Sequence, residues 1–301
     1  MEYIVTGGAG YIGGHVVDML VSNKQDVTVI DDMSSGNHVN KKSKFIKFDL
    51  RKQFTEYKKL DLESPIIIHL AANPDVKESM NNIQDHYERD VTATLNALEL
   101  ARKLDASKII FSSTSAVYGN AVQMPTPESY PSNPISNYGM FKVLGEGMLE
   151  YYSENYGIKS VALRFANITG GRVSHGIMYN FAHLLKKNAP IEIWGDGKQS
   201  KSYIYISDLL NAMMIATNKS KKTFDVFNIG NVDSCSVLEI VEIFMKYAGP
   251  GIKANHIGSQ AGDVRTMLLD ISKISSLGWK PTCNSRQAVS KSFDDLIGKA
   301  K

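Results

Sequence analysis

Cysteine is scarce in this chain, which has only Cys235 and Cys283 among its 301 residues. Two cysteines are too few for a disulfide framework or a thiolate zinc site, so we expect a reduced, cytoplasmic protein without a metal. The first residues predict a strand and lack the features of a signal peptide, so none is expected. The longest strongly apolar run, Pro65–Ala72, is interrupted by His69 and is far shorter than the roughly 20 residues of a membrane span.

The chain also lacks a strong excess of one charge, with 34 Lys and Arg against 31 Asp and Glu. A nucleic-acid surface needs a dense basic stripe with stacking aromatics, which is not evident here, so we expect no nucleic-acid partner. The 9 prolines and 23 glycines exclude collagen-like and low-complexity classes. Hydrophobic residues make up 43% of the chain, enough for a full core, and the length predicts two domains or one large α/β unit.

Short apolar runs alternate with helical stretches through the first half of the chain. The runs are mostly unalternated, as expected for strands that are buried on both faces. We expect strands at Tyr3–Thr6, Val27–Ile30, Lys44–Phe48, Ile66–Leu70, Lys108–Ser112 and Ser160–Phe165, with helices at Ile12–Ser22, His86–Leu104 and Gly139–Tyr156. This order predicts an α/β, Rossmann-like fold with a doubly wound parallel sheet.

The alternation loosens after about Ala166, which predicts a second, smaller α/β lobe that binds substrate. We expect its strands at Ile191–Trp194, Tyr203–Ile206 and Val226–Ile229, and its helices at Met178–Lys187, Ser207–Thr217 and Ser236–Met245. The predicted domains are residues 1–166 and 167–301, with segments near 202–230 crossing back to the first domain.

A glycine-rich segment lies at the first strand-to-helix turn, where Gly7, Gly10 and Gly13 satisfy G-x-x-G-x-x-G. Glycine allows a tight turn and a close approach of the backbone to a pyrophosphate, which the helix N-terminus then stabilises. The next strand ends at Asp31, where a carboxylate can accept hydrogen bonds from ribose hydroxyls and repel a 2′-phosphate. These residues predict an NAD site.

Three further features follow the neighbouring strands. Asp49 either contacts the adenine or caps a helix over Arg51–Tyr57, and both interpretations remain open. The small residues of Leu70–Ala72 let a dinucleotide lie across the carboxyl edge of the sheet. We expect His69 to be a hydrogen-bonded core histidine rather than a catalyst.

Tyr138 and Lys142 are spaced i,i+4 at the start of a predicted helix, which places both side chains on one face. An adjacent ammonium and a positive nicotinamide ring favour the phenolate, which can accept a proton from a sugar hydroxyl. Thr114, or a neighbouring serine, closes the fifth strand at the predicted cofactor edge and can hold the substrate oxygen against the tyrosine.

With these motifs, the chain resembles the extended short-chain dehydrogenase/reductase family, and within it the nucleotide-sugar 4-epimerases of the UDP-glucose/UDP-galactose type. The resemblance runs nearly end to end. Besides the glycine-rich turn, Asp31 and Tyr138 with Lys142, it rests on His69–Ala72, Ser112–Gly119, Leu163–Asn167, Trp194–Gln199, Tyr203–Asp208 and Ala261–Val264. It implies a tightly held NAD that oxidises the sugar at C4 and returns the hydride to the other face.

The resemblance also implies the residue roles, with Thr114, Tyr138 and Lys142 as catalytic residues. The implied cofactor residues are Gly7, Gly10, Tyr11, Ile12, Asp31, Asp49, Leu50, Leu70, Ala71 and Ala72, together with Tyr138 and Lys142. The implied substrate residues are Lys77, Ser79, Thr114, Asn167, His175, Trp194, Lys201, Tyr203, Gln260, Asp263 and Met267. A homodimer through the helices at His86–Leu104 and Gly139–Tyr156 is implied as well.

Several positions depart from the family pattern. Lys201 and Gln260 stand where arginines usually hold the diphosphate, which leaves the identity of the substrate less defined than the reaction. Met267 either lines the sugar pocket, where it would accept N-acetylhexosamines, or is a core methionine. A dehydratase needs acidic residues after Thr114, and Ser115 and Ala116 stand there instead. A 4-keto-sugar reductase and a non-catalytic NAD-binding protein remain as alternatives.

Overall fold

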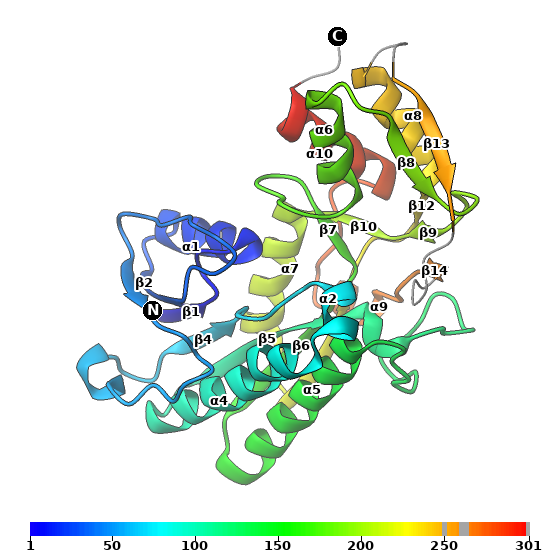
Figure 1. Cartoon of the computed structure of the whole chain (residues 1–301). Coiled ribbons are helices and arrows are strands. Elements are labelled where there is room, and N and C mark those ends of the chain that lie inside the picture. Colours follow the sequence, from blue (N-terminus) through cyan, green and yellow to red (C-terminus); the bar gives the residue numbers. More distant parts are fainter. Residues whose placement is uncertain (249–251, 259–264, 299–301) are drawn as a thin grey trace. The chain divides into compact units, whose positions relative to one another are not determined.

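The computed structural model describes residues 1–248, 252–258 and 265–298 and separates the chain into two compact units (Figure 1). The first unit holds Met1–Gly119, Pro131–Arg164 and Met213–Phe227. The second holds Asn120–Tyr130, Phe165–Ala212 and Asn228–Lys301.

A seven-stranded sheet with the order β11-β6-β5-β4-β1-β2-β3 forms the centre of the first unit. Its strands are β1 (Glu2–Thr6), β2 (Asp26–Asp31), β3 (Lys44–Lys47), β4 (Ile66–His69), β5 (Lys108–Thr114), β6 (Lys159–Phe165) and β11 (Phe224–Ile229). β1 pairs in parallel with both β2 and β4, so the strand order reverses at β1. The predicted Rossmann-like, doubly wound fold is confirmed, and such a reversal is where these sheets bind ligands.

Helices connect and cover these strands. They are α1 (Tyr11–Ser22), α2 (Val76–Asn81), α3 (Ile83–Tyr87), α4 (Ala93–Lys103), α5 (Asn137–Tyr156) and the end of α7 (Ile206–Lys219), with 3₁₀ turns at Tyr57–Leu60 and Ser115–Tyr118. α4 and α5 lie side by side (Figure 1). Apolar residues of both helices, such as Leu98 and Leu149, pack with Ile67 and Ile109 of the sheet in one buried cluster. No helix in the described ranges is long and apolar enough to span a membrane.

Two local expectations change. The single helix predicted over His86–Leu104 is interrupted by a π-helical turn at Glu88–Thr92, between α3 and α4. The helix considered over Arg51–Tyr57 does not form. Instead, Asp49 Oδ1 accepts a hydrogen bond from Arg51 N at 2.9 Å, which closes a local turn.

The second unit is built from short strands and five helical segments in its described part. These elements are β7 (Asn167–Thr169), α6 (Ile177–Lys186), β8 (Ile191–Trp194), β9 (Ser200–Lys201), β10 (Tyr203–Tyr205), the start of α7, β12 (Cys235–Ser236), α8 (Val237–Ala248), β13 (Ala254–Ile257), β14 (Thr266–Met267), α9 (Ser272–Ser276) and α10 (Ser285–Ile297). Its core includes Phe181 of α6, Phe244 of α8 and Phe293 of α10, and the ring of Phe244 packs in tilted contact with both of the others, with ring centres 5.3 Å apart.

The sequence predicts a boundary after residue 166 with segments near 202–230 crossing back to the first domain, and two segments of the structure lie outside a simple division at that boundary. Asn120–Tyr130 belongs to the second unit, because Thr126 N donates to Leu268 O at 2.8 Å and Asp270 N donates to Thr126 O at 2.9 Å. Met213–Phe227 returns to the first unit, where β11 forms an edge of the large sheet. Backbone pairing between distant segments therefore sets these boundaries.

Candidate active site

The glycine-rich turn joins β1 to α1 in a conformation that requires glycine. Gly7 has φ +68°, and a Cβ there would lie 2.6 Å from Ala71 N. A Cβ at Gly13 would lie 2.0 Å from Gly7 O. Within the described chain, no side chain caps the N-terminus of α1, and its first turn contains no acidic residue. This cradle of backbone suits a diphosphate.

Asp31 lies at the end of β2, directly beside this turn. Its two carboxylate oxygens accept hydrogen bonds from Ala9 N at 2.9 Å and Met33 N at 2.6 Å. Burial raises the pKa of Asp31, and these two hydrogen bonds oppose the rise. The carboxylate is therefore fixed in direction, with lone pairs left for ribose hydroxyls. The turn and Asp31 together fit NAD.

We expect the protein to bind NAD at least about a hundredfold more tightly than NADP. Two like charges 4 Å apart repel by about 4 kcal/mol at an effective dielectric constant of 20, so a 2′-phosphate beside Asp31 is strongly disfavoured. Isothermal titration calorimetry with both dinucleotides measures the ratio. Asp31→Ser should reduce the preference for NAD over NADP. Asp32→Ser removes the neighbouring carboxylate and should leave most of that preference intact. Equal affinities in the unchanged protein would remove Asp31 from this role.

The other residues predicted to bind the cofactor differ in burial and in their contacts within the protein. Tyr11 and Ile12 begin α1, and Leu70, Ala71 and Ala72 follow β4, all of them half-buried. Leu50 is buried in the apolar core, so its side chain has a packing role that the sequence analysis did not assign. Asp49 forms an ion pair with Arg51 at 2.8 Å, which lowers the pKa of Asp49. Its contact with adenine stays a prediction.

The three catalytic candidates lie together in the first unit. Ser136 caps α5 by accepting a hydrogen bond from Gly139 N at 3.1 Å, which places Tyr138 in the first turn. Lys142 Nζ lies 5.7 Å from the centre of the Tyr138 ring and 4.9 Å from that of Phe111. Thr114, the last residue of β5, forms a hydrogen bond with the Tyr138 side chain. The structure therefore assembles the predicted tyrosine, lysine and threonine.

The electrostatics of Tyr138 differ from the expectation that Lys142 favours its phenolate. Burial raises the pKa of Tyr138, the negative charge of Asp90 raises it further, and the hydrogen bond with Thr114 lowers it. Burial also lowers the pKa of Lys142, while Asp90 raises it. In the protein alone the phenol is therefore the favoured form, because the ammonium is paired with Asp90 and burial penalises the phenolate.

His69 is the hydrogen-bonded core histidine that the sequence analysis predicted. Its Nδ1 lies 2.7 Å from Thr6 Oγ1, and its Nε2 lies 3.1 Å from Thr94 Oγ1. The ring stacks on Phe111, with ring centres 5.9 Å apart. Burial and the charge of Lys142 lower the pKa of His69 to about 3, so the imidazole is neutral at physiological pH.

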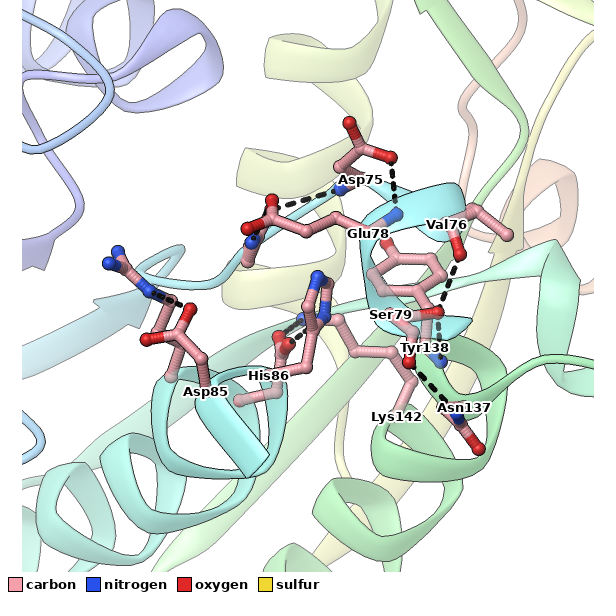
Figure 2. A network of polar contacts seen from close by, with 12 residues as sticks. Asp75, Val76, Glu78, Ser79, Asp85, His86, Asn137, Tyr138 and Lys142 are labelled. Atoms are coloured by element: carbon pink, nitrogen blue, oxygen red, sulfur yellow. Dashed lines mark hydrogen bonds and ion pairs between the residues drawn. The ribbon is translucent and has the colours of Figure 1, made fainter. Parts of the chain in front are cut away.

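The substrate candidates Lys77 and Ser79 lie on α2, where they differ in exposure. Lys77 is exposed, whereas Ser79 is fully buried. Figure 2 shows Ser79 against the first turn of α5: its hydroxyl donates to Val76 O at 2.6 Å and accepts from Tyr138 N at 3.2 Å, while Asn137 Nδ2 donates to Ser79 O at 2.8 Å. The hydroxyl therefore closes a turn within α2 and also receives the backbone N–H of Tyr138, which joins α2 to the first turn of α5. A contact of Ser79 with substrate stays a prediction.

Two neighbours of the tyrosine and lysine were missed by the sequence analysis. His86 on α3 and Asp90 in the π turn are buried beside Lys142. Their i,i+4 spacing inside a predicted helix was the available signal, but it does not distinguish a buried pair from an exposed one.

The remaining substrate candidates belong to the second unit. Met267 of β14 pairs with Lys201 of β9, so these two are neighbours, and Met267 is buried. Trp194 ends β8 with 40% of its surface exposed, Asn167 Nδ2 donates to Ser202 O at 3.3 Å, and His175 is exposed. Gln260 and Asp263 lie outside the described residues.

Tyr203 is the most buried aromatic residue among these candidates, and its contact with substrate stays a prediction. It lies on β10 and is 6% exposed, packed in the apolar core of the second unit. Its backbone N–H donates to Ser285 Oγ at 3.1 Å. Because β10 is covered by α10, the ring packs inside the unit, and the structure gives it a core role.

Comparison with known proteins adds three findings. A sequence profile of the NAD-dependent epimerase/dehydratase family matches residues 3–230. A putative UDP-glucose 4-epimerase from Methanocaldococcus jannaschii is 35% identical over 295 residues, with 96% of each chain covered. The solved structures of UDP-glucose 4-epimerases from Thermotoga maritima with UDP-glucose (31% identity, 98% of each chain) and Thermus thermophilus with NAD (28% identity, 99% of each chain) both superpose with a TM-score of 0.92.

Proposed function

We propose that this chain, which belongs to the NAD-dependent epimerase/dehydratase family, is a nucleotide-sugar 4-epimerase that inverts C4 of a UDP-hexose. The observation that carries the proposal is the group formed by Thr114, Tyr138 and Lys142 in the unit that also holds the glycine-rich turn and Asp31. Reversible oxidation of an alcohol requires a proton acceptor and a site for the dinucleotide, and this unit contains candidates for both. The relatives named as UDP-glucose 4-epimerases support the substrate class.

The residues of the chain divide the chemistry between them. Gly7, Gly10 and Asp31 hold the cofactor, and NAD, when bound, supplies a hydride acceptor and a positive charge. Tyr138 Oη takes the proton of the 4-hydroxyl and returns it to the 4-keto oxygen after the sugar has turned over. Thr114 holds the substrate oxygen against Tyr138 through its hydroxyl. Because the pKa of Tyr138 is raised in the protein alone, its phenolate depends on added positive charge beside it.

The second unit is assigned to recognition of the nucleotide sugar. Trp194 offers an exposed ring for the uracil, and Asn167 and Lys201 offer polar groups for the diphosphate. Lys201 supplies a point charge where an arginine would bind two oxygens. Met267 beside it is the candidate for the limit on sugar size, and its unbranched side chain can move to admit a larger substituent.

The test of the function is incubation of the purified protein with UDP-, dTDP- and GDP-hexoses, followed by chromatography of the sugars. The expected result is interconversion of UDP-glucose and UDP-galactose without added reductant, since the hydride returns to the sugar. A product that accumulates only with stoichiometric oxidation or reduction of the cofactor would instead identify a dehydrogenase or reductase.

The protein is further proposed to be a homodimer. Large apolar side chains are exposed on and just before the two helices that lie side by side in Figure 1: Tyr87, Leu95, Met140, Leu144 and Tyr151. Met140, Leu144 and Tyr151 recur on one face of α5. Exposed apolar patches of this kind mark protein interfaces, and two such helix pairs can form a four-helix contact related by a two-fold axis.

Leu144→Glu should convert the dimer into a monomer, because it places a charge in the centre of the apolar stripe. Light scattering after size-exclusion chromatography measures the mass directly. Val122→Glu is the matched control, since Val122 is 90% exposed and lies outside these helices. A monomeric mass in the unchanged protein would refute the dimer. An unaltered dimer in Leu144→Glu would place its interface elsewhere.

The two cysteines are consistent with the proposed cytoplasmic location. Cys235 and Cys283 are both free thiols and both buried. Burial raises the pKa of each thiol, which keeps the reactive thiolate form rare and suits a reducing compartment.

A further inference from the structure

Three ionisable side chains form a buried cluster beside the proposed base, and the catalytic assignment uses only one of them. Asp90 Oδ2 lies 3.3 Å from His86 Nδ1, and Asp90 Oδ1 lies 3.6 Å from Lys142 Nζ. All three side chains are at most 3% exposed. Figure 2 shows His86 and Lys142 beside Tyr138. Asp90 is thus held between an imidazole and the ammonium.

The cluster is unusual because its contacts are longer than ordinary hydrogen bonds. In the described chain, none of the four polar side-chain atoms of His86 and Asp90 has a hydrogen-bond partner. Buried polar atoms are nearly always satisfied in folded proteins, and an exception calls for an explanation, of which a role in catalysis is one. Asp90 therefore acts on His86 and Lys142 across contacts of 3.3 Å and 3.6 Å rather than through short hydrogen bonds.

The π turn at Glu88–Thr92 brings Asp90 to this position. Such turns add one residue to a helical turn and occur frequently at functional sites. Thr94 Oγ1 donates to Asp90 O at 2.5 Å and also contacts His69 Nε2, so the backbone of Asp90 is tied to β4. The helical backbone thereby aims the carboxylate at α5, and an apolar residue in the same place would leave the ammonium of Lys142 buried without an opposite charge.

No other carboxylate among the described residues is shown in contact with this ammonium. On α5 the next acid, Glu146, is paired with Arg164. On α3, Asp85 is paired with Arg51 and Arg89. On α2, Lys77 and Glu78 are exposed, and from β4 and β5 the neighbours are the neutral His69 and Thr114.

We propose that Asp90, supported by His86, is a positioning residue that fixes both the place and the charge of Lys142 and keeps Tyr138 protonated until positive charge arrives beside it. The proposal deepens the assignment of Tyr138 and Lys142, and it rests on that proposed function. Two opposing effects follow from one carboxylate. The carboxylate of Asp90 stabilises the charged ammonium of Lys142. It also disfavours the phenolate of Tyr138, so the protein alone does not bury a second negative charge beside Asp90.

Asp90→Asn tests the proposal, because it keeps the shape of the side chain and removes its charge. The pKa of both Tyr138 and Lys142 should fall, by up to about 1–3 units, the range for the effect of a nearby charge. Activity that depends on the phenolate is lost as pH falls through the pKa of Tyr138. Activity that depends on the ammonium is lost as pH rises through the pKa of Lys142. In a plot of kcat/KM against pH, the acidic limb reports Tyr138 and the basic limb reports Lys142. Both limbs should therefore move to lower pH.

A purely structural role for Asp90 gives a different result, because it lowers the rate at every pH without moving either limb. Asp85→Asn is the matched control, since it removes one carboxylate from the same helical segment where two arginines and solvent screen it. Its limbs should stay in place. Fixed limbs in Asp90→Asn, or an equal shift in the control, would overturn the proposal.

A direct readout separates this proposal from the proposed reaction. The ultraviolet absorbance of the phenolate is titrated in the protein without substrate, as the difference between each protein and the same protein carrying Tyr138→Phe. The Tyr138 signal should appear at lower pH in Asp90→Asn and at higher pH in Lys142→Met, which leaves the carboxylate unpaired. The second variant keeps the test valid if the first does not fold.

These spectra also distinguish the possible failures. If the Tyr138 titration shifts in the stated directions but the protein has no epimerase activity, the role of Asp90 is supported and the proposed reaction is refuted. If the protein has epimerase activity but neither variant shifts the Tyr138 titration, the proposed reaction is supported and the role of Asp90 is refuted.

Discussion

Replacing Tyr138 with phenylalanine should lower turnover of UDP-glucose by about 10²–10⁴, the usual cost of losing one positioned acid or base. The change removes only the hydroxyl, so the ring keeps its place in the first turn of α5 and Thr114 loses one hydrogen-bond partner. The glycine-rich turn and Asp31 are untouched, so NAD affinity should change little. Initial rates, the melting temperature and calorimetric titration with NAD measure the three quantities separately.

The control for this variant is Tyr151→Phe on the same helix. Tyr151 is exposed and lies more than three turns after Tyr138, so its hydroxyl should be dispensable for turnover. Near-normal turnover in Tyr138→Phe would remove this residue from the mechanism. A parallel loss in folding stability would show that the hydroxyl acts on structure instead.

The second large effect is expected on stability, at the buried ion pair between Glu146 and Arg164. Glu146 Oε1 accepts from Arg164 Nε at 2.9 Å and from Ser113 Oγ at 2.5 Å, and Glu146 Oε2 accepts from Arg164 Nη2 at 2.6 Å. Arg164 Nη1 donates to Tyr118 Oη at 2.8 Å. This network joins α5, β5 and β6 inside the first unit.

Glu146→Ala should lower the free energy of unfolding by about 3–5 kcal/mol, because it leaves a buried guanidinium without an opposite charge. Chemical denaturation followed by circular dichroism measures the change. Glu150→Ala, one turn later on the exposed face of α5, should stay within about 0.5 kcal/mol. The double variant Glu146→Leu with Arg164→Leu should recover much of the loss, since apolar replacement of a buried pair is often nearly neutral. A single variant as stable as the unchanged protein would contradict this account.

The local parts of the site could be predicted because short-range geometry fixes them. Gly7, Gly10 and Gly13 lie within one turn, and the restrictions on their backbone act over a few residues. Tyr138 and Lys142 share a helix face because the helical repeat is constant. The long elements of the first unit were predicted close to their observed bounds, since buried parallel strands and amphipathic helices leave strong apolar patterns. Short elements such as α2 and β7, and the C-terminal helix α10, were not predicted.

Other features depend on which distant segments pack together. The sequence shows that Asp90 and Glu146 are acidic, but not that each is buried beside a particular cation from another element. The π turn that aims Asp90 at Lys142 gives no clear sequence signal, because its residues fit an ordinary helix equally well. The burial of Ser79 likewise follows from the packing of α2 on α5.

By itself, then, the sequence determined the family, the doubly wound sheet, the dinucleotide turn and the tyrosine–lysine–threonine group, since each rests on local spacing or on a long shared pattern. Only the tertiary structure decided that Tyr138 has a raised pKa in the protein alone, that Tyr203 is a core residue, and that Asn120–Tyr130 joins the second unit. The physical reason is that burial and the charges of distant neighbours set a side chain's energy, and both exist only once the chain has folded.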